Sequence, residues 1–319
     1  MRLWINSIDI SPHTGYGRAA SELTKALERA DIDIHEGSPT VLNFCMPKDY
    51  IYRDYTVGYT PWESTNIPVN WRQGLMRVDD LWSTSTWSSQ ILHAHTGRTV
   101  STVHHGLDSV WLTHKHQKEN SRPFTFLHVG EPAVRKGGDT VLEAWYKYFR
   151  HTNCRLIYKT TGIPMARVKD RGGSIVYSPP MLPEGSIINQ VYSDLEMWRL
   201  YCEVDCMVYP TRGEGFGFIP LEAIASGLPT ILPASGGTGD FSSLGIPLIH
   251  SMWTNSNQEE HPGMWLDHDI DEVISEMNNV VRNYDQYAEW AYENGKIAKQ
   301  VFDWDSVAKK IITMLDGQL

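Results

Sequence analysis

Residues 205–233 read DCMVYPTRGEGFGFIPLEAIASGLPTILP, and this stretch decides what kind of fold the chain can adopt. It begins with a short apolar run typical of a buried strand, passes through a glycine-rich loop, and becomes helical from near Pro220. A second apolar run, LPTILP, follows the helix. A strand, a glycine loop, a helix and another strand in this order predict a βαβ unit of a parallel sheet.

Two acids in this stretch, Glu214 and Glu222, differ in how easily local structure explains them. Glu222 is expected in the first turn of the helix, where the helix dipole favours a carboxylate. Glu214 is expected in the loop at the carboxyl end of the strand, where open parallel sheets bind ligands. A carboxylate there can accept hydrogen bonds from the hydroxyls of a sugar or a ribose.

The same alternation of strands and helices covers the rest of the chain, with apolar runs such as FTFLHVG, CRLIYKTTG and SIVYSP read as strands. A polar segment at residues 111–123, which ends in proline, separates two alternating units. We therefore expect an α/β protein with two Rossmann-like domains, residues 1–115 and 116–302, whose parallel sheets face a central cleft. Residues 303–319 are expected to form a final helix after a break near Phe302–Trp304.

Composition narrows the class of protein. The net charge of −10 argues against a protein that coats duplex nucleic acid, although it leaves room for a local basic groove. The four cysteines show no paired metal spacing, which favours free thiols in a reducing compartment. The amino terminus does not resemble a signal peptide, and no apolar run approaches the ~20 residues that span a bilayer. We expect a soluble, cytoplasmic protein without stable membrane insertion.

Two other loops are candidates for binding an anion. Gly15 and Gly17 lie in HTGYGR, between the first strand and a helix, where the backbone can approach a ligand closely. Arg135 and Lys136 lie in HVGEPAVRKGGDT, just before a helix whose dipole does not favour cations. A bound phosphate explains the basic pair, although a solvated pair and a purely structural glycine turn remain open alternatives.

These segments together resemble the family 4 glycosyltransferases of the GT-B fold. Glu214 and Glu222 form an E-x7-E motif that resembles the signature of the family, and five other segments resemble it in the same order. They are WESTNIP with VDDLWSTSTWSSQIL, HHGLD, HVGEPAVRKGGDTVLEAW, SGGTGD and FDWDSVAKKI. The resemblance implies that the final helix crosses back to the first domain.

The resemblance also implies roles for individual residues. Glu222 would hold the ribose hydroxyls of a nucleotide, and Glu214 would contact the donor sugar. Arg135 and Lys136 would neutralise the diphosphate as it leaves, an electrostatic role that often supplies a large share of catalysis.

The glycine loops have backbone roles in this scheme. Amides near Gly215, Phe216 and Gly217 would lie beside the sugar and the phosphates. Gly15 and Gly17 would let the first domain close on the donor.

The sequence departs from the family pattern at two places. Many members carry an Arg directly after the VG dipeptide, where this chain has Glu131. Many also have a His at the end of a strand in the first domain, near the level where this chain has YTPWEST. Candidates for that part of the sugar or acceptor pocket are Trp62, Glu63, His13, His104 and His105, although each histidine has a structural interpretation as well.

The resemblance implies a retaining, metal-independent transferase that needs no cofactor and uses a nucleotide-diphosphate sugar, such as a UDP- or GDP-sugar, as co-substrate. The acceptor could be a saccharide, a glycoconjugate, a protein or a modified nucleobase. Two alternatives stay open: a sugar-nucleotide epimerase or phosphorylase of the same fold, and a non-catalytic module that binds nucleotide sugars.

Overall fold

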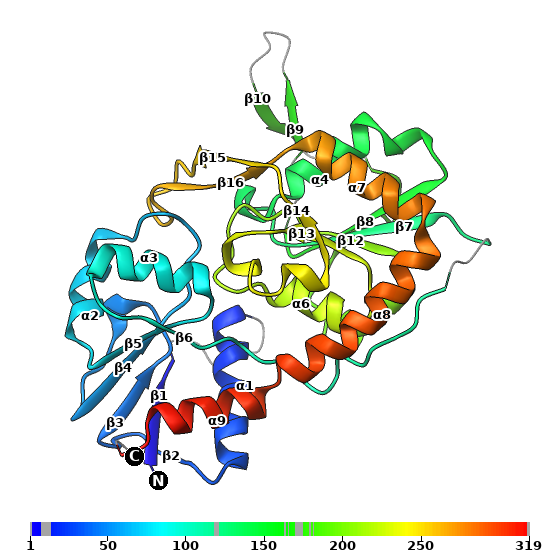
Figure 1. The fold of residues 1–319 in the computed structure, drawn as a ribbon. Coiled ribbons are helices and arrows are strands. Elements are labelled where there is room, and N and C mark those ends of the chain that lie inside the picture. The colour runs from blue at the N-terminus through cyan, green and yellow to red at the C-terminus, as the bar shows by residue number, and fades with distance from the viewer. Residues whose placement is uncertain are drawn as a thin grey trace.

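The computed structural model describes residues 2–7, 14–117, 121–162, 164, 166–169, 175–178, 180 and 182–317. Two six-stranded sheets with helices packed around them form the fold (Figure 1). The first sheet has the order β2-β1-β3-β4-β5-β6, and its neighbouring strands are all parallel. Its strands are β1 (Arg2–Asn6), β2 (Asp33–Ile34), β3 (Thr40–Asn43), β4 (Tyr55–Tyr59), β5 (Asp80–Ser83) and β6 (Ser101–Thr102).

The second sheet has the order β11-β8-β7-β12-β13-β14 and is also parallel throughout. Its strands are β7 (Phe124–Val129), β8 (Cys154–Thr160), β11 (Ile187–Asn189), β12 (Cys206–Val208), β13 (Thr230–Pro233) and β14 (Ile246–Leu248). The two parallel sheets confirm the expected α/β fold class with two Rossmann-like halves. The division of the chain at particular residue boundaries stays a prediction.

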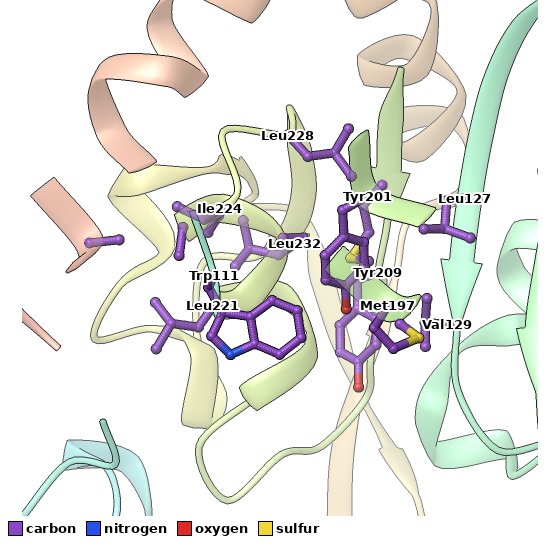
Figure 2. Packing of buried hydrophobic residues seen from close by; sticks show 14 of the residues in the cluster. Trp111, Leu127, Val129, Met197, Tyr201, Tyr209, Leu221, Ile224, Leu228 and Leu232 are labelled. Atoms are coloured by element: carbon purple, nitrogen blue, oxygen red, sulfur yellow. The ribbon is translucent and has the colours of Figure 1, made fainter. Parts of the chain in front are cut away.

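The helices are α1 (Gly15–Arg29), α2 (Arg72–Arg77), α3 (Thr86–Thr96), α4 (Gly138–Lys147), α5 (Asp194–Glu203), α6 (Phe218–Ala225), α7 (Ile270–Arg282), α8 (Tyr284–Val301) and α9 (Trp304–Met314). Successive side chains of β7 point to opposite faces of the second sheet, and apolar residues lie on both of these faces. Phe126 packs with α4 and α7 on one face, and Leu127 packs with α5 and α6 on the other. Figure 2 shows this second cluster, in which Trp111 and Tyr201 are fully buried.

The carboxyl-terminal helices cross from the second sheet back to the first, as Figure 1 shows in red. Helix α8 ends at Val301, and Asp303 caps α9 by accepting a hydrogen bond from the amide of Ser306 at 2.9 Å. Helix α9 then packs against α1, with Ile311 buried in the core of the first half. The predicted return of the final helix is thereby confirmed.

Two details of the predicted secondary structure are wrong. The run SIVYSP does not join the parallel sheet, because β10 (Ile175–Ser178) pairs antiparallel with β9 (Ala166–Lys169). The edge position beside β8 is taken instead by β11. Helix α6 begins at Phe218 rather than near Pro220, so Glu222 lies beyond its first turn.

A second antiparallel hairpin, β15 (Ser251–Asn255) with β16 (Met264–His268), lies between the two halves (Figure 1). Within the described part of the chain, no helix combines the length and the apolar character needed to cross a membrane.

Candidate active site

A cavity of about 850 Å³ opens between the two halves of the molecule. Residues of both halves line it, including most of the candidates from the sequence: Gly15, Trp62, Glu63, His105, Arg135, Lys136, Glu214, Gly215, Phe216, Gly217 and Glu222. Gly17 is buried at the start of α1, where its amide donates to the side chain of Thr14 at 3.0 Å. His13 lies outside the described residues.

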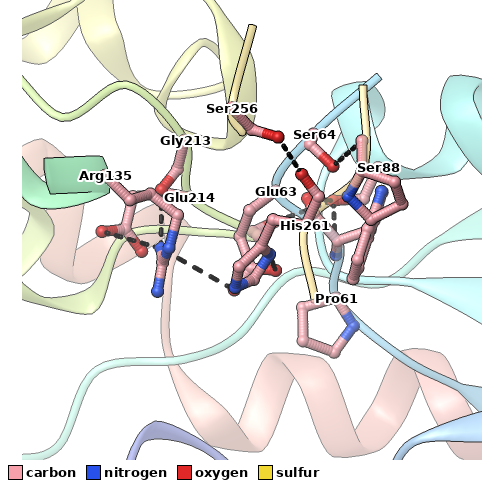
Figure 3. Close-up of polar contacts among 12 residues, drawn as sticks. Pro61, Glu63, Ser64, Ser88, Arg135, Gly213, Glu214, Ser256 and His261 are labelled. Atoms are coloured by element: carbon pink, nitrogen blue, oxygen red, sulfur yellow. Dashed lines mark hydrogen bonds and ion pairs between the residues drawn. The ribbon is translucent and has the colours of Figure 1, made fainter. Parts of the chain in front are cut away.

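Glu214 lies in the loop after β12 and is surrounded by hydrogen-bond donors and cations. Its Oε1 accepts from Nζ of Lys136 at 2.5 Å and from the hydroxyl of Tyr209 at 2.7 Å. Nη1 of Arg135 lies 4.0 Å from the same oxygen (Figure 3). Burial raises the pKa of Glu214, but the attraction of Lys136 and Arg135 outweighs it and holds the pKa below its usual value. The site therefore keeps a charged carboxylate beside two cations.

A buried ion pair stands behind this cluster and was missed by the sequence reasoning. The guanidinium of Arg212 binds both oxygens of Asp139 at 2.7 and 2.9 Å. It also donates to Oδ1 of Asp267 and to the carbonyl oxygen of Val134, in the turn that precedes Arg135. Arg212 therefore connects the loop that carries Glu214 with the start of α4 and with strand β16. Its bond to Val134 also holds the turn that carries Arg135 and Lys136 beside Glu214.

Glu222 lies at another part of the cavity, and its side chain is almost fully buried. Its Oε1 accepts from Nη1 of Arg18, which comes from α1 in the other half, at 2.5 Å. Arg18 also binds Asp108 at 2.9 Å and lies 3.7 Å from Asp194. Burial raises the pKa of Glu222 to about 7, although Arg18 opposes this shift. The helix dipole cannot explain this acid, because it lies outside the first turn of α6.

Two glycines of the loop are required for different reasons, Gly215 for a close approach and Gly217 for its backbone conformation. A Cβ atom on Gly215 would lie 2.3 Å from Cβ of Pro61, so only glycine lets the loop meet the first half here. Gly217 has a φ of +106° and ends the loop where α6 begins. The carbonyl oxygen of Gly215 accepts a hydrogen bond from the hydroxyl of Thr84 at 2.7 Å. Phe216 turns its ring into the core, so only its backbone is available near the loop.

The aromatic candidates from the first half are largely structural in their contacts. Trp62 is buried, and its indole donates to the carbonyl oxygen of Asn66 at 2.8 Å. His105 stacks on Phe218 with ring centroids 4.8 Å apart, and burial lowers its pKa to about 3, so the ring is neutral. His104 instead binds the carboxylate of Asp240 at 2.9 Å and links the two halves.

Four residues that contribute to the site were not predicted: Arg18, Tyr209, Arg212 and His261. Arg18 follows the glycines of HTGYGR, and Arg212 begins the RGEG run, so each lay next to a motif that had been singled out. Tyr209 lies near the end of the apolar run DCMVYP, whose pattern indicates a strand and no site. Nothing in the local sequence around His261 indicates a site.

Comparison with known proteins provides independent evidence. A family model described as "Family 4 Glycosyltransferase in conflict systems" matches residues 85–311. The uncharacterized glycosyltransferase MJ1607 of Methanocaldococcus jannaschii is 23% identical over 191 residues, which are 59% of this chain and 43% of that protein. This chain spans less than half the length of the curated relatives that it matches.

Solved structures share the fold along the whole chain. Sucrose-phosphate synthase from Thermosynechococcus elongatus has a TM-score of 0.67 at 13% identity, and the match covers 100% of this chain and 99% of that one. Anabaena Alr3699/HepE in complex with UDP-glucose also has a TM-score of 0.67 at 13% identity, covering 99% and 100%. These likenesses show the GT-B fold, and the family model spans well over half of the sequence. The chain therefore belongs to the family 4 glycosyltransferases.

Proposed function

We propose that this protein transfers a sugar from a nucleotide-diphosphate sugar to an acceptor hydroxyl, with retention of the anomeric configuration and without a metal ion. One observation carries the proposal: a single cavity holds Arg135 and Lys136 beside Glu214, and the buried carboxylate of Glu222 lines the same cavity. We assign residues 1–115 to the acceptor side, residues 116–302 to the donor side, and residues 303–319 to the helix that connects them.

Each of the two carboxylates is proposed to bind a different part of the donor. We assign the ribose hydroxyls to Glu222 and the donor sugar to Glu214. Lys136 and Arg135 lie close enough to Glu214 to reach a diphosphate between sugar and ribose. Cations held in place before the reaction stabilise the charge that develops on the leaving diphosphate without further reorganisation.

The reaction that fits this arrangement occurs on one face of the sugar. The bond between the anomeric carbon and the diphosphate oxygen breaks, and its electron pair stays with the diphosphate. The acceptor oxygen bonds to the same face of that carbon, and its proton passes to an oxygen of the leaving phosphate. Lys136 and Arg135 balance the negative charge on the departing group.

The donor base and sugar are the first quantities to determine. Anabaena Alr3699/HepE was solved with UDP-glucose, which makes UDP-sugars the first donors to test on this chain. The test is to incubate the protein with UDP-, GDP-, ADP- and TDP-sugars and to measure the release of free nucleotide. An epimerase would interconvert sugars without releasing nucleotide, a phosphorylase would require phosphate, and a binding module would bind without turnover.

A matched pair of variants connects the test to the site. Glu214→Gln keeps the shape of the side chain and removes its charge, and we expect turnover to fall by about 100-fold or more. Glu293→Gln is the control, because Glu293 pairs with Lys296 on the surface of α8. Full activity in Glu214→Gln contradicts our assignment of the site, whereas binding of every sugar nucleotide without turnover in the wild type contradicts the proposed reaction.

A further inference from the structure

Hydrogen bonds connect the loop between β15 and β16, residues 256–263, and the first residue of β16 to the first half of the molecule. The amide of Thr65 donates to the carbonyl oxygen of Met264 at 2.9 Å, and the amide of Met264 donates to the hydroxyl of Thr65 at 2.8 Å. The hydroxyl of Ser64 donates to the carbonyl oxygen of Pro262 at 2.8 Å. The loop is therefore held directly beside residues 62–66, at the wall of the cavity.

This attachment brings His261 against Glu63 (Figure 3). The imidazole stacks on the ring of Trp62, with centroids 5.4 Å apart and planes inclined by 29°. Nδ1 of His261 lies 3.6 Å from Oε2 of Glu63 and has no hydrogen-bond partner among the described residues. Burial lowers the pKa of His261, although Glu63 opposes the shift, so the ring is neutral at neutral pH. A neutral imidazole beside a carboxylate can both donate and accept hydrogen bonds.

The pair lies near the group that we assign to the donor sugar. Nη1 of Arg135 lies 3.8 Å from Oε1 of Glu63 and 4.0 Å from Oε1 of Glu214. Glu63 and His261 are thus separated from Glu214 by one guanidinium, and they have no part in the donor contacts proposed above. An acceptor hydroxyl that attacks the sugar must come from a neighbouring position of this kind.

The charges on this wall restrict what can bind there. Besides Glu63, the loop adds Glu259 and Glu260, which are exposed and line the same cavity. Among the lining cations that the structure describes, only Lys48 is exposed, and the others are partly or fully buried. A phosphorylated acceptor would meet like charges here, whereas the hydroxyls of a neutral saccharide can donate to carboxylates and pack against an aromatic ring.

We infer that Glu63 and His261 bind the acceptor, and that this acceptor is a neutral, polyhydroxylated compound rather than a phosphorylated one. This inference rests on the proposed function, because it needs a donor sugar at Glu214. It assigns an acceptor-binding role to the loop between β15 and β16, which belongs to the same half of the chain as the donor site.

The test measures nucleotide release from whichever sugar nucleotide the donor panel selects, with two added probes. We expect methyl α-D-glucopyranoside to accelerate release and glucose 6-phosphate to leave the rate near that in water. His261→Gln and Glu63→Gln should raise the half-saturating concentration of the glycoside by about tenfold, since the first removes the imidazole ring and the second replaces a charged acceptor with a neutral amide. Release in water is measured for both variants as well, because only a loss confined to the reaction with the glycoside belongs to acceptor binding.

The matched control is His250→Gln, because His250 pairs with Glu272 at the protein surface just before β15. Three results overturn the inference: preference for glucose 6-phosphate, no acceleration by the glycoside, or unchanged half-saturation in His261→Gln. Equal loss of release in water and with the glycoside assigns the pair to the donor site and also overturns it. Failure of the wild type to turn over any sugar nucleotide is a different result, which contradicts the proposed function itself.

Discussion

The two carboxylates of the E-x7-E motif are both buried in one cavity, yet their surroundings are opposite. Glu214 has two cations from its own half, Lys136 and Arg135, and its pKa is held below the usual value. Glu222 has one cation, Arg18, which comes from the other half, and its pKa is raised to about 7. The Glu214 site is therefore assembled within one half, whereas the Glu222 site is complete only when both halves are in contact.

The largest effect is expected behind the Glu214 site, where the Arg212–Asp139 pair is buried. Asp139→Asn removes the buried two-point partner of Arg212 and leaves its guanidinium with the partly exposed Asp267, so the free energy of unfolding should fall by about 3 kcal/mol. Urea denaturation measures the change. Asp271→Asn is the control, because Asp271 is exposed in a surface pair with Lys147, and it should cost less than about 1 kcal/mol. Similar losses in both variants would contradict a special role for the buried pair.

The second-largest effect tests whether the residues around Glu214 catalyse the sugar transfer. Lys136→Ala removes the cation closest to Glu214, and we expect kcat to fall by about 100- to 1,000-fold. Lys147→Ala, near the other end of α4, removes an exposed lysine and should leave kcat unchanged. Single-turnover kinetics with the selected donor separate the chemical step from binding. A loss confined to KM would show that Lys136 binds the donor without stabilising the transition state.

The contrast between the two sites also explains what the sequence alone could reveal. Glu214 and Lys136 lie in loops after strands and before helices, so local pattern and glycine spacing were enough to single them out. Arg18 and His261 each contact a residue of the other half of the molecule. Such contacts between distant parts of the chain leave no local pattern in the sequence. The start of α6 was misplaced because Gly217, with its positive φ, ends the loop before Phe218. Because α6 begins two residues earlier than predicted, the helix dipole no longer explains why Glu222 is an acid.

The third effect tests the dependence of Glu222 on the other half of the chain. Removing Arg18 leaves the buried carboxylate without its cation, so the pKa of Glu222 should rise further. Because we assign ribose binding to the charged form, Arg18→Met should weaken sugar-nucleotide binding at pH 7 by about tenfold or more. Isothermal titration calorimetry measures this affinity.

Arg29→Met is the matched control, because Arg29 lies on the same helix and pairs with Asp305 at the surface. It should leave the affinity for the sugar nucleotide unchanged. Tighter binding in Arg18→Met would show instead that Arg18 competes with the nucleotide for Glu222.

The smallest effect is the pH dependence of the wild type. Glu222 has a pKa of about 7, so it becomes protonated and loses its charge as the pH falls from 8 to 6. If the charged form holds the ribose, the dissociation constant for UDP-glucose should increase by up to about tenfold over this interval. The sugar nucleotide is the better probe than UDP, because its terminal phosphate is esterified and does not titrate near pH 6. Glu222→Gln should bind more weakly than the wild type at pH 8 and show little change with pH. A wild-type affinity that is constant from pH 6 to 8, or a variant that keeps the full pH dependence, would place the titrating group elsewhere and remove the proposed difference between the two carboxylates.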